Sequence, residues 1–109
     1  MSFSLDIHPH VGEDVMDIFL FIDQNSPQQA DLFAEHVLYE YDKILTEWNN
    51  NVFYQKGRIV KSRPVGKFNK YMVFYTVDEV QQRVEVLAVL YGGLNPEKLS
   101  ELIAGRLRS

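Results

Sequence analysis

The hydrophobic residues of this 109-residue chain change their spacing twice, and these changes limit the folds that it can adopt. Phe3, Leu5 and Ile7 alternate with polar residues, which is the two-residue period of a half-buried strand. From about residue 10 to residue 48, apolar side chains recur every three or four residues, as in amphipathic helices. Beyond residue 58 the chain becomes rich in β-branched and aromatic residues, which favour strands. Helices early and strands late predict an α+β fold.

The helical part of the chain divides at Asn25-Ser26-Pro27. Ser26 can cap a second helix, and Pro27 fits the first helical position, where an N–H group is not needed. The first helix is expected over residues 10–23 and the second over residues 27–48. The short connection between them predicts an antiparallel helical hairpin.

Three strands and a helix are expected in the second half, with strands over residues 58–63, 70–77 and 83–90. Pro64 and Gly66 end the first of these, and the last two form a β-hairpin. In the last strand we expect Val84, Val86, Ala88 and Leu90 on one face, and Glu85, Leu87 and Val89 on the other. The final helix runs from residue 96 to about 107, with Leu99, Leu102 and Ile103 inward. The predicted order is β-α-α-β-β-β-α, a single domain (1–109) with a helical hairpin packed on an antiparallel sheet.

Composition and motifs exclude several classes of protein. The absence of cysteine excludes disulfides and thiolate metal sites. No apolar run approaches the roughly 20 residues that cross a bilayer, and the first residues lack signal-peptide features, so we expect a cytoplasmic protein without membrane contact. His8 and His10 have no third ligand nearby, so they are interpreted as surface histidines, and no metal or cofactor is expected. The acidic side chains near the start of the first helix are attributed to its dipole: Glu13, Asp14 and Asp17.

The charge of the chain is divided unevenly between its halves. Residues 1–50 hold ten acidic side chains and one basic one, whereas residues 51–109 hold ten basic and five acidic, so the halves carry −9 and +5. From Lys56 to Lys70 there are six bases and no acid. Such a segment is typical of contact with an acidic or polyanionic partner. It is also typical of lysines that protect an exposed sheet edge from aggregation.

The basic segment joins an aromatic hairpin, and the two together are the strongest candidate site. Its members are Lys61, Arg63, Lys67, Lys70, Tyr71, Tyr75, Arg83 and Tyr91. A basic groove with aromatic side chains suits RNA or DNA contact. Alternatively, Tyr71 and Tyr75 share a strand face with Val73 and Val77 and belong to the core. Tyr91 precedes Gly92-Gly93 at a strand end, and its role as a contact, structural or catalytic residue stays open.

Several strings in the chain resemble the ParE/RelE toxin superfamily of type II toxin–antitoxin modules. They are residues 17–23 (DIFLFID) followed by 26–33 (SPQQADLF), residues 63–66 (RPVG) leading to 71–75 (YMVFY), and residues 84–92 (VEVLAVLYG). Their order and spacing cover nearly the whole chain. The resemblance implies the α+β fold described above and a small antitoxin partner whose helical tail wraps the toxin.

The resemblance leaves two activities open. ParE-like members poison DNA gyrase without known hydrolytic chemistry, whereas RelE-like members cut mRNA in the ribosomal A site, using basic residues and a C-terminal tyrosine or histidine. The strings are more similar to the ParE branch, although Tyr91 stands where that branch commonly has a histidine. A pI of about 5.3 also disfavours ribosome binding, which needs many phosphate contacts. We therefore expect a non-enzymatic toxin that inhibits DNA gyrase and is neutralised by a cognate antitoxin.

Site residues follow for each hypothesis. Target contacts are expected at Lys61, Arg63, Lys67 and Tyr91. In the alternative, a ribosome-dependent mRNA endoribonuclease, Arg63, Arg83 and Tyr91 are catalytic, and Arg63 stabilises the phosphate transition state. The broad apolar faces of both helices exceed what one sheet contact needs, so an antitoxin is expected to bind at Met16, Phe19, Leu20, Leu38 and Leu45. A second alternative is a non-toxic family member that retains only antitoxin binding.

Overall fold

The computed structural model describes residues 3–50, 52–53 and 60–108. Its elements are β1 (Ser4–Ile7), α1 (Val11–Asp23), α2 (Pro27–Glu47), β2 (Val52–Phe53), β3 (Lys61–Val65), β4 (Phe68–Asp78), β5 (Arg83–Tyr91) and α3 (Pro96–Arg108), with a 3-10 turn over Trp48–Asn50. The predicted α+β order is confirmed, with the two-residue β2 in addition. Residues 58 and 59, where the strand expected over residues 58–63 begins, lie outside the described residues.

The five strands form one sheet in the order β1-β5-β4-β3-β2. Neighbours from β2 to β5 are antiparallel, but β1 runs parallel to β5, with Ser4 opposite Arg83 and Ile7 opposite Val86. The sheet is therefore mixed, which corrects the expectation of a purely antiparallel one. A parallel pair needs a long crossover, and the helical hairpin and three strands between β1 and β5 supply it.

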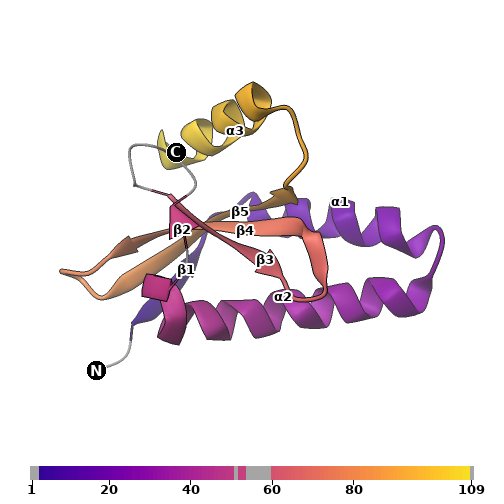
Figure 1. Ribbon diagram of the computed structural model, residues 1–109, viewed down its shortest axis with the longest axis horizontal. Helices are drawn as coiled ribbons and strands as arrows, with labels where there is room; N and C mark the ends of the chain where they lie inside the picture. Colours follow the sequence, from indigo (N-terminus) through magenta and orange to yellow (C-terminus); the bar gives the residue numbers. More distant parts are fainter. Residues whose placement is uncertain (1–2, 51, 54–59, 109) are drawn as a thin grey trace.

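Helices cover both faces of the sheet, with the α1–α2 hairpin on one side and α3 on the other (Figure 1). The hairpin-side core is built from these buried residues: Val11, Phe33, Val37, Tyr41, Ile44, Val65, Val73, Tyr75, Val84, Val86 and Val89. The α3-side core contains Val60, Phe74, Leu87, Ala88, Leu99 and Ile103. Leu99 and Ile103 point inward as predicted. Leu102 does not, and it is 36% exposed. The buried face of α3 contains Leu99 and Ile103, which are four residues apart and so lie on the same side of the helix.

Local signals set the start of α2. The Ser26 hydroxyl accepts a hydrogen bond from the Gln29 N–H at 3.2 Å, and Pro27 occupies the first turn, as the sequence predicts. Apolar burial then holds the helix on the sheet through the fully buried side chains of Ala30, Phe33 and Ile44.

A β-bulge at Leu87 reverses which side chains of β5 face the hairpin. Ala88 pairs with Phe74, and Val86 pairs with Tyr75, so Leu87 is the extra residue that has no partner in β4. Up to Val86 the predicted alternation is correct. Beyond the bulge it is wrong, because one inserted residue moves every later side chain to the opposite face. Val89 therefore packs with Val84 and Val86 on the hairpin side, while Ala88 faces α3.

The β3–β4 turn depends on Gly66, which has a φ of +49°. A Cβ atom at this position would lie 2.5 Å from Nδ1 of His36 on α2. Pro64 does not end the strand as expected, because β3 continues through it to Val65. A proline is tolerated there because the described part of β2 pairs only with Ser62 and Lys61, which leaves Pro64 at a sheet edge.

Gly66→Ala is expected to lower the free energy of unfolding by about 2 kcal/mol, because alanine is strained at positive φ and its methyl group meets His36. Urea denaturation of the purified variants measures this loss. Gly105→Ala is the matched control: its methyl group meets nothing in α3, and the variant should gain roughly 0.5–1 kcal/mol. Equal stability of Gly66→Ala and the parent chain would contradict the steric argument.

None of the helices in the described part of the chain combines the length and apolar character that a bilayer crossing requires.

Candidate functional site

The candidate site is a pocket of about 470 Å³ between α1 and the adjacent ends of β4 and β5, which we call the tyrosine pocket. Its lining residues are Asp17, Ile18, Phe21, Lys70, Tyr71 and Tyr91. Because of the Leu87 bulge, Tyr91 lies directly opposite Tyr71 on the hairpin side of the sheet. The two rings are 6.0 Å apart between centroids and meet edge to face.

The glycine pair after β5 allows Tyr91 to take this position. The Gly92 N–H donates a hydrogen bond to the Lys70 carbonyl at 2.7 Å, which holds the end of β5 against β4. A Cβ atom on Gly93 would lie 2.6 Å from Cζ of Tyr91, so the phenol ring covers the space that a side chain would occupy. Gly93 is therefore required for the close approach of the ring to the backbone.

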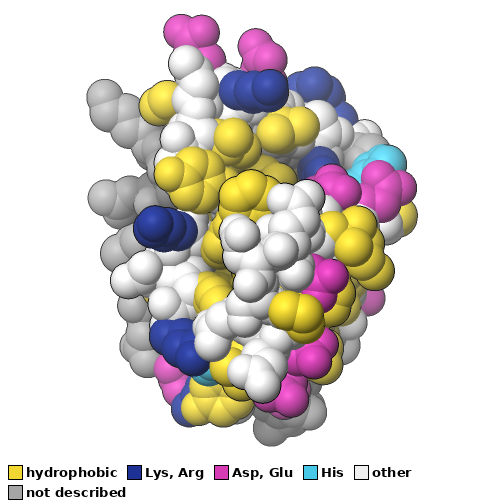
Figure 2. Space-filling view, turned by 90° about the vertical axis from the view of Figure 1, so that its right-hand side faces the viewer, with side chains coloured by type: hydrophobic (Ala, Val, Ile, Leu, Met, Phe, Trp, Pro, Cys, Tyr) yellow, Lys and Arg dark blue, Asp and Glu magenta, His cyan; other side chains and the backbone are white. Residues whose placement is uncertain are grey.

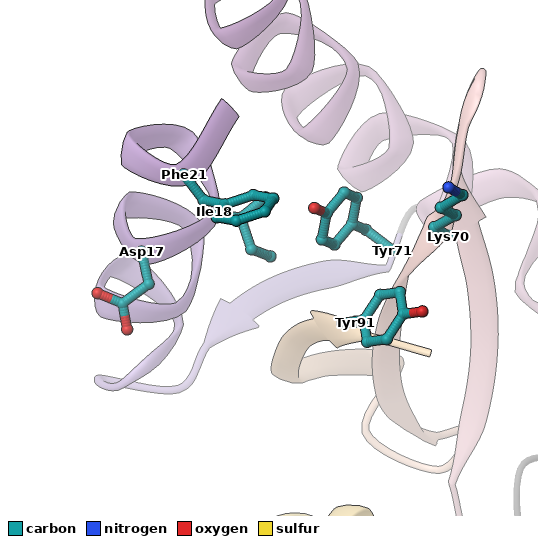
Figure 3. Close-up of a pocket in the computed structure, with 6 residues that line it drawn as sticks. All are labelled: Asp17, Ile18, Phe21, Lys70, Tyr71 and Tyr91. Carbon is teal, nitrogen blue, oxygen red and sulfur yellow. The ribbon is translucent and has the colours of Figure 1, made fainter. Parts of the chain in front are cut away.

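Figure 3 shows how the side chains are arranged in the tyrosine pocket. Ile18 and Phe21 project from α1 toward the Tyr71 ring, and Tyr91 lies on the far side of that ring. The Asp17 carboxylate points away from the cavity, so the surface that it offers is mainly aromatic. Phe21 is 61% exposed and Tyr91 is 45% exposed, which makes both accessible to another molecule.

The tyrosine pocket is better suited to contact than to proton transfer. Burial, with a smaller contribution from Tyr91, raises the pKa of Tyr71 above its ordinary value. A general base that works near neutral pH needs a pKa shifted in the opposite direction. Tyr71 also packs against Phe33, with ring centroids 5.5 Å apart, so it is half-buried and serves both core and pocket. The two tyrosine rings can stack on a planar or apolar group, and a tyrosine hydroxyl can donate a hydrogen bond.

Arg63 lies on the hairpin side of β3, where acidic residues of α2 hold its guanidinium group. Nε pairs with the carboxylate of Glu40, and Nη1 lies 3.3 Å from Glu47 Oε1. The Arg63 side chain is only 16% exposed and that of Glu40 only 6%. By strand spacing, the Cα atoms of Arg63 and Tyr91 are roughly 12 Å apart, with Tyr71 and Val73 between them.

Of the other predicted basic residues, Lys70 lines the tyrosine pocket beside Tyr91, but Lys61, Lys67 and Arg83 do not. Lys61 is opposite Tyr75 on the hairpin side and is 8% exposed, whereas Lys67 is exposed near the β3–β4 turn. Arg83 and Tyr91 are the first and last residues of β5, roughly 26 Å apart, and Arg83 pairs with Asp6. Of the predicted target contacts, Lys67 and Tyr91 are exposed, and only Tyr91 lines the pocket.

Sequence reasoning did not assign Phe21 or Ile18 to this site, whereas Tyr71 was among its candidate members. A usable signal for Phe21 was present, because it falls outside the apolar stripe of its helix and has no core position to fill. Ile18 belongs to that stripe and carries no such signal. The sequence left Tyr71 open between the site and the core, and the structure places it in both, because it lines the pocket and packs against Phe33. For Tyr75 the core alternative is correct and the site assignment is wrong: the side chain is fully buried, and its hydroxyl donates to the Trp48 carbonyl at 3.1 Å.

A second surface, here called the hairpin groove, lies between α1 and α2. Its volume is about 460 Å³, and nearly all of its lining is apolar: Ile7, Val11, Gly12, Val15, Met16, Phe19, Ala34, Val37, Leu38 and Tyr41. Three of the predicted antitoxin contacts, Met16, Phe19 and Leu38, meet there. Leu20 and Leu45 do not line it: Leu20 is 51% exposed on α1, and Leu45 packs partly against the hairpin-side core.

Two interpretations of polar residues near α1 need correction. His8 is not a surface residue: it is 4% exposed, and its Nδ1 accepts a hydrogen bond from the His10 N–H at 3.1 Å. Asp14 does more than complement the helix dipole, because it is buried and paired with Arg106 of α3. Within the described ranges, no three His, Cys, Asp or Glu side chains gather closely enough to bind a metal ion.

The chain matches no protein-family model, and a search of curated proteins finds no significant match.

Proposed function

We propose that this chain is the toxin component of a type II toxin–antitoxin module, of the ParE-like class, which inhibits DNA gyrase in the cytoplasm and is neutralised by a cognate antitoxin. The observation that carries the proposal is the exposed apolar surface of the helical hairpin. Met16, Leu20 and Leu38 are each more than half exposed, although the opposite faces of their helices already pack on the sheet. A small protein that leaves such a surface uncovered is typical of one that binds a partner.

The arrangement of cationic residues favours gyrase inhibition over mRNA cleavage. A nuclease of this kind needs its cations beside the acid or base, so that they stabilise the charge that develops on the phosphate. Here Arg63 is engaged by two carboxylates of α2, and Arg83 is at the far end of β5 from Tyr91. The accessible part of the site is the aromatic surface of Tyr91 and Phe21, which suits contact with a protein target.

The nuclease alternative keeps one supporting observation, the exposed Tyr91 beside Lys70 at the edge of the pocket. Pulse labelling of DNA and protein synthesis, shortly after the chain is induced alone, distinguishes the two functions. Under the proposal DNA synthesis falls first, and purified protein inhibits supercoiling by gyrase. An earlier fall in protein synthesis would identify the ribosome as the target and support the nuclease alternative. Unimpaired growth would favour a non-toxic antitoxin-binding protein.

Tyr91→Ala is expected to reduce toxicity at least about 10-fold, whereas Tyr91→Phe retains it, because contact requires the ring but not the hydroxyl. Toxicity is measured as the inducer concentration that halves growth, at equal protein levels. Tyr39→Ala is the matched control, since Tyr39 is 53% exposed on α2 outside the pocket, and its toxicity should not change. If Tyr91→Phe were as inactive as Tyr91→Ala, the hydroxyl would be required and the contact role would be wrong.

A further inference from the structure

The rims of the hairpin groove are acidic. On α2, Asp31 lies seven residues before Leu38, Glu35 lies three before it, and Asp42 lies four after it. At these helical spacings all three acids are on the same side of the helix as Leu38. All three side chains are exposed. On α1, Glu13 stands three residues before Met16 and is also exposed. In the view of Figure 2, which is turned by 90° from that of Figure 1, acidic and hydrophobic side chains lie side by side along the right-hand edge.

Little positive charge on the hairpin balances these acids. Lys43 is the single Lys or Arg in residues 1–50. Its Nζ lies 3.4 Å from Glu47 Oε2 and 5.3 Å from the centre of the Tyr39 ring. On the helical wheel of α2, Lys43 is displaced by about 140° from Leu38, so it does not reach the rim of the groove. The groove therefore joins an apolar floor to a negative border.

We propose that the hairpin groove binds a basic amphipathic helix, whose apolar stripe fills the floor while lysine or arginine side chains on both flanks meet the acidic rims. The identification of that helix with a segment of the antitoxin rests on the proposed function. Charge complementarity then selects the partner as well as speeding its association.

Charge also decides against the other occupants. A second copy of this chain would bring the same acidic rims together, and like charges across an interface are unfavourable. A nucleic acid would be repelled by the same carboxylates. The floor of the groove rules out a purely ionic partner, because its lining is almost entirely apolar and includes the buried side chains of Val11, Val37 and Tyr41. Burial, reinforced by Asp14, raises the pKa of Tyr41 to about 12, so the floor adds no negative charge at neutral pH.

The length of the groove sets the size of the partner. Asp31 to Asp42 spans 11 helical steps, or roughly 16 Å along α2. A helix of about 14 residues therefore covers the floor and reaches all three acids. Exposed ion pairs each contribute a factor of roughly two to five in affinity, so three of them give a preference of about 10- to 100-fold for a basic over an acidic helix.

The test uses two fluorescent 14-residue peptides with the same leucine stripe and the same hydrocarbon staple, one flanked by lysine and the other by glutamate. Fluorescence anisotropy with the full chain at low salt should show the lysine peptide binding at least about 10-fold more tightly. The preference should weaken as salt rises. Leu38→Gln should weaken the lysine peptide several-fold, since it removes apolar floor from an exposed position that the fold does not need.

Variants that remove acidic side chains test whether the preference for the lysine peptide arises at the rims of the groove. In D31N/E35Q/D42N the two peptides should bind with affinities within about threefold of each other. The matched control E79Q/E97Q/E101Q removes three exposed acids outside the groove and should keep the full preference. Circular dichroism confirms that both variants are folded. Equal binding of the two peptides to the parent chain, no binding of either, or the same effect of both triple variants would overturn the inference.

These outcomes are separate from those of the proposed function. A chain that is toxic but shows no charge preference overturns the inference and leaves the toxin function standing. A chain that prefers the lysine peptide but is harmless upholds the inference and removes the toxin function.

Discussion

Asp14→Ala is expected to lower the free energy of unfolding by about 3–5 kcal/mol, the cost of leaving one partner of a buried ion pair without the other. The Asp14 carboxylate receives hydrogen bonds from both terminal nitrogens of Arg106, and Nη2 lies 2.8 Å from Oδ1. It also accepts the Val89 N–H at 3.1 Å, while Arg106 donates to the Leu87 carbonyl at 3.0 Å. The pair therefore provides hydrogen-bond partners for backbone groups of β5 beyond the end of β1, and it joins α1 to α3.

Chemical denaturation measures the loss, and hydrogen exchange in α3 should rise because Arg106 no longer holds that helix to β5. Glu13→Ala is the matched control: Glu13 is the neighbouring acid in the same helical turn, 79% exposed, and its removal should cost less than about 1 kcal/mol. Asp14→Leu/Arg106→Met should recover most of the lost stability, since both buried charges are then gone. Similar losses for Glu13→Ala and Asp14→Ala would show that the buried pair has no special role.

Arg63→Met is expected to have a comparable effect, about 3–5 kcal/mol, because Glu40 would keep a buried carboxylate after losing the cation beside it. Burial lowers the pKa of Arg63, but the hydrogen bonds and charges of Glu40 and Glu47 together outweigh it and raise the pKa above its ordinary value. Arg83→Met is the matched control. Arg83 and its partner Asp6 are both about half exposed, and breaking that pair should cost less than about 1 kcal/mol.

The double variant Arg63→Met/Glu40→Met separates a structural role from a role at the target. Removing both charges should restore most of the stability. If Arg63 only joins β3 to α2, toxicity should return together with stability. A double variant that is stable but harmless would give Arg63 a direct role at the target and would favour the nuclease alternative.

Local patterns were enough to predict most of the architecture. The 3.6-residue period of α1 and α2, the Ser26 cap and Pro27 place the hairpin, because helix formation depends on neighbours three and four residues away. The strand pair β4–β5 follows from β-branched and aromatic runs around a short turn. These are interactions of short range, and a single sequence contains them.

The candidate site was predicted less completely, because it depends on which side chains meet across the sheet. Tyr91 was singled out from its place before the glycine pair, and it does line a pocket. Its neighbours Tyr71 and Phe21 join it only because the Leu87 bulge turns the end of β5 toward the hairpin. No local pattern marks a bulge inside a continuous apolar strand, since Val, Leu and Ala suit either face.

The sequence alone determined the order of helices and strands, the two apolar helix faces and the unequal charge of the two halves. Which of these charges are exposed to a partner follows from contacts between elements that the sequence does not show. Asp14 and Arg106 are 92 residues apart, and Arg63 and Glu40 are 23 apart, yet each pair is joined across layers and withdrawn from the surface. The acids that border the hairpin groove remain exposed. The number of charged residues can be read from the sequence, whereas the burial of each charge depends on contacts between distant segments of the chain.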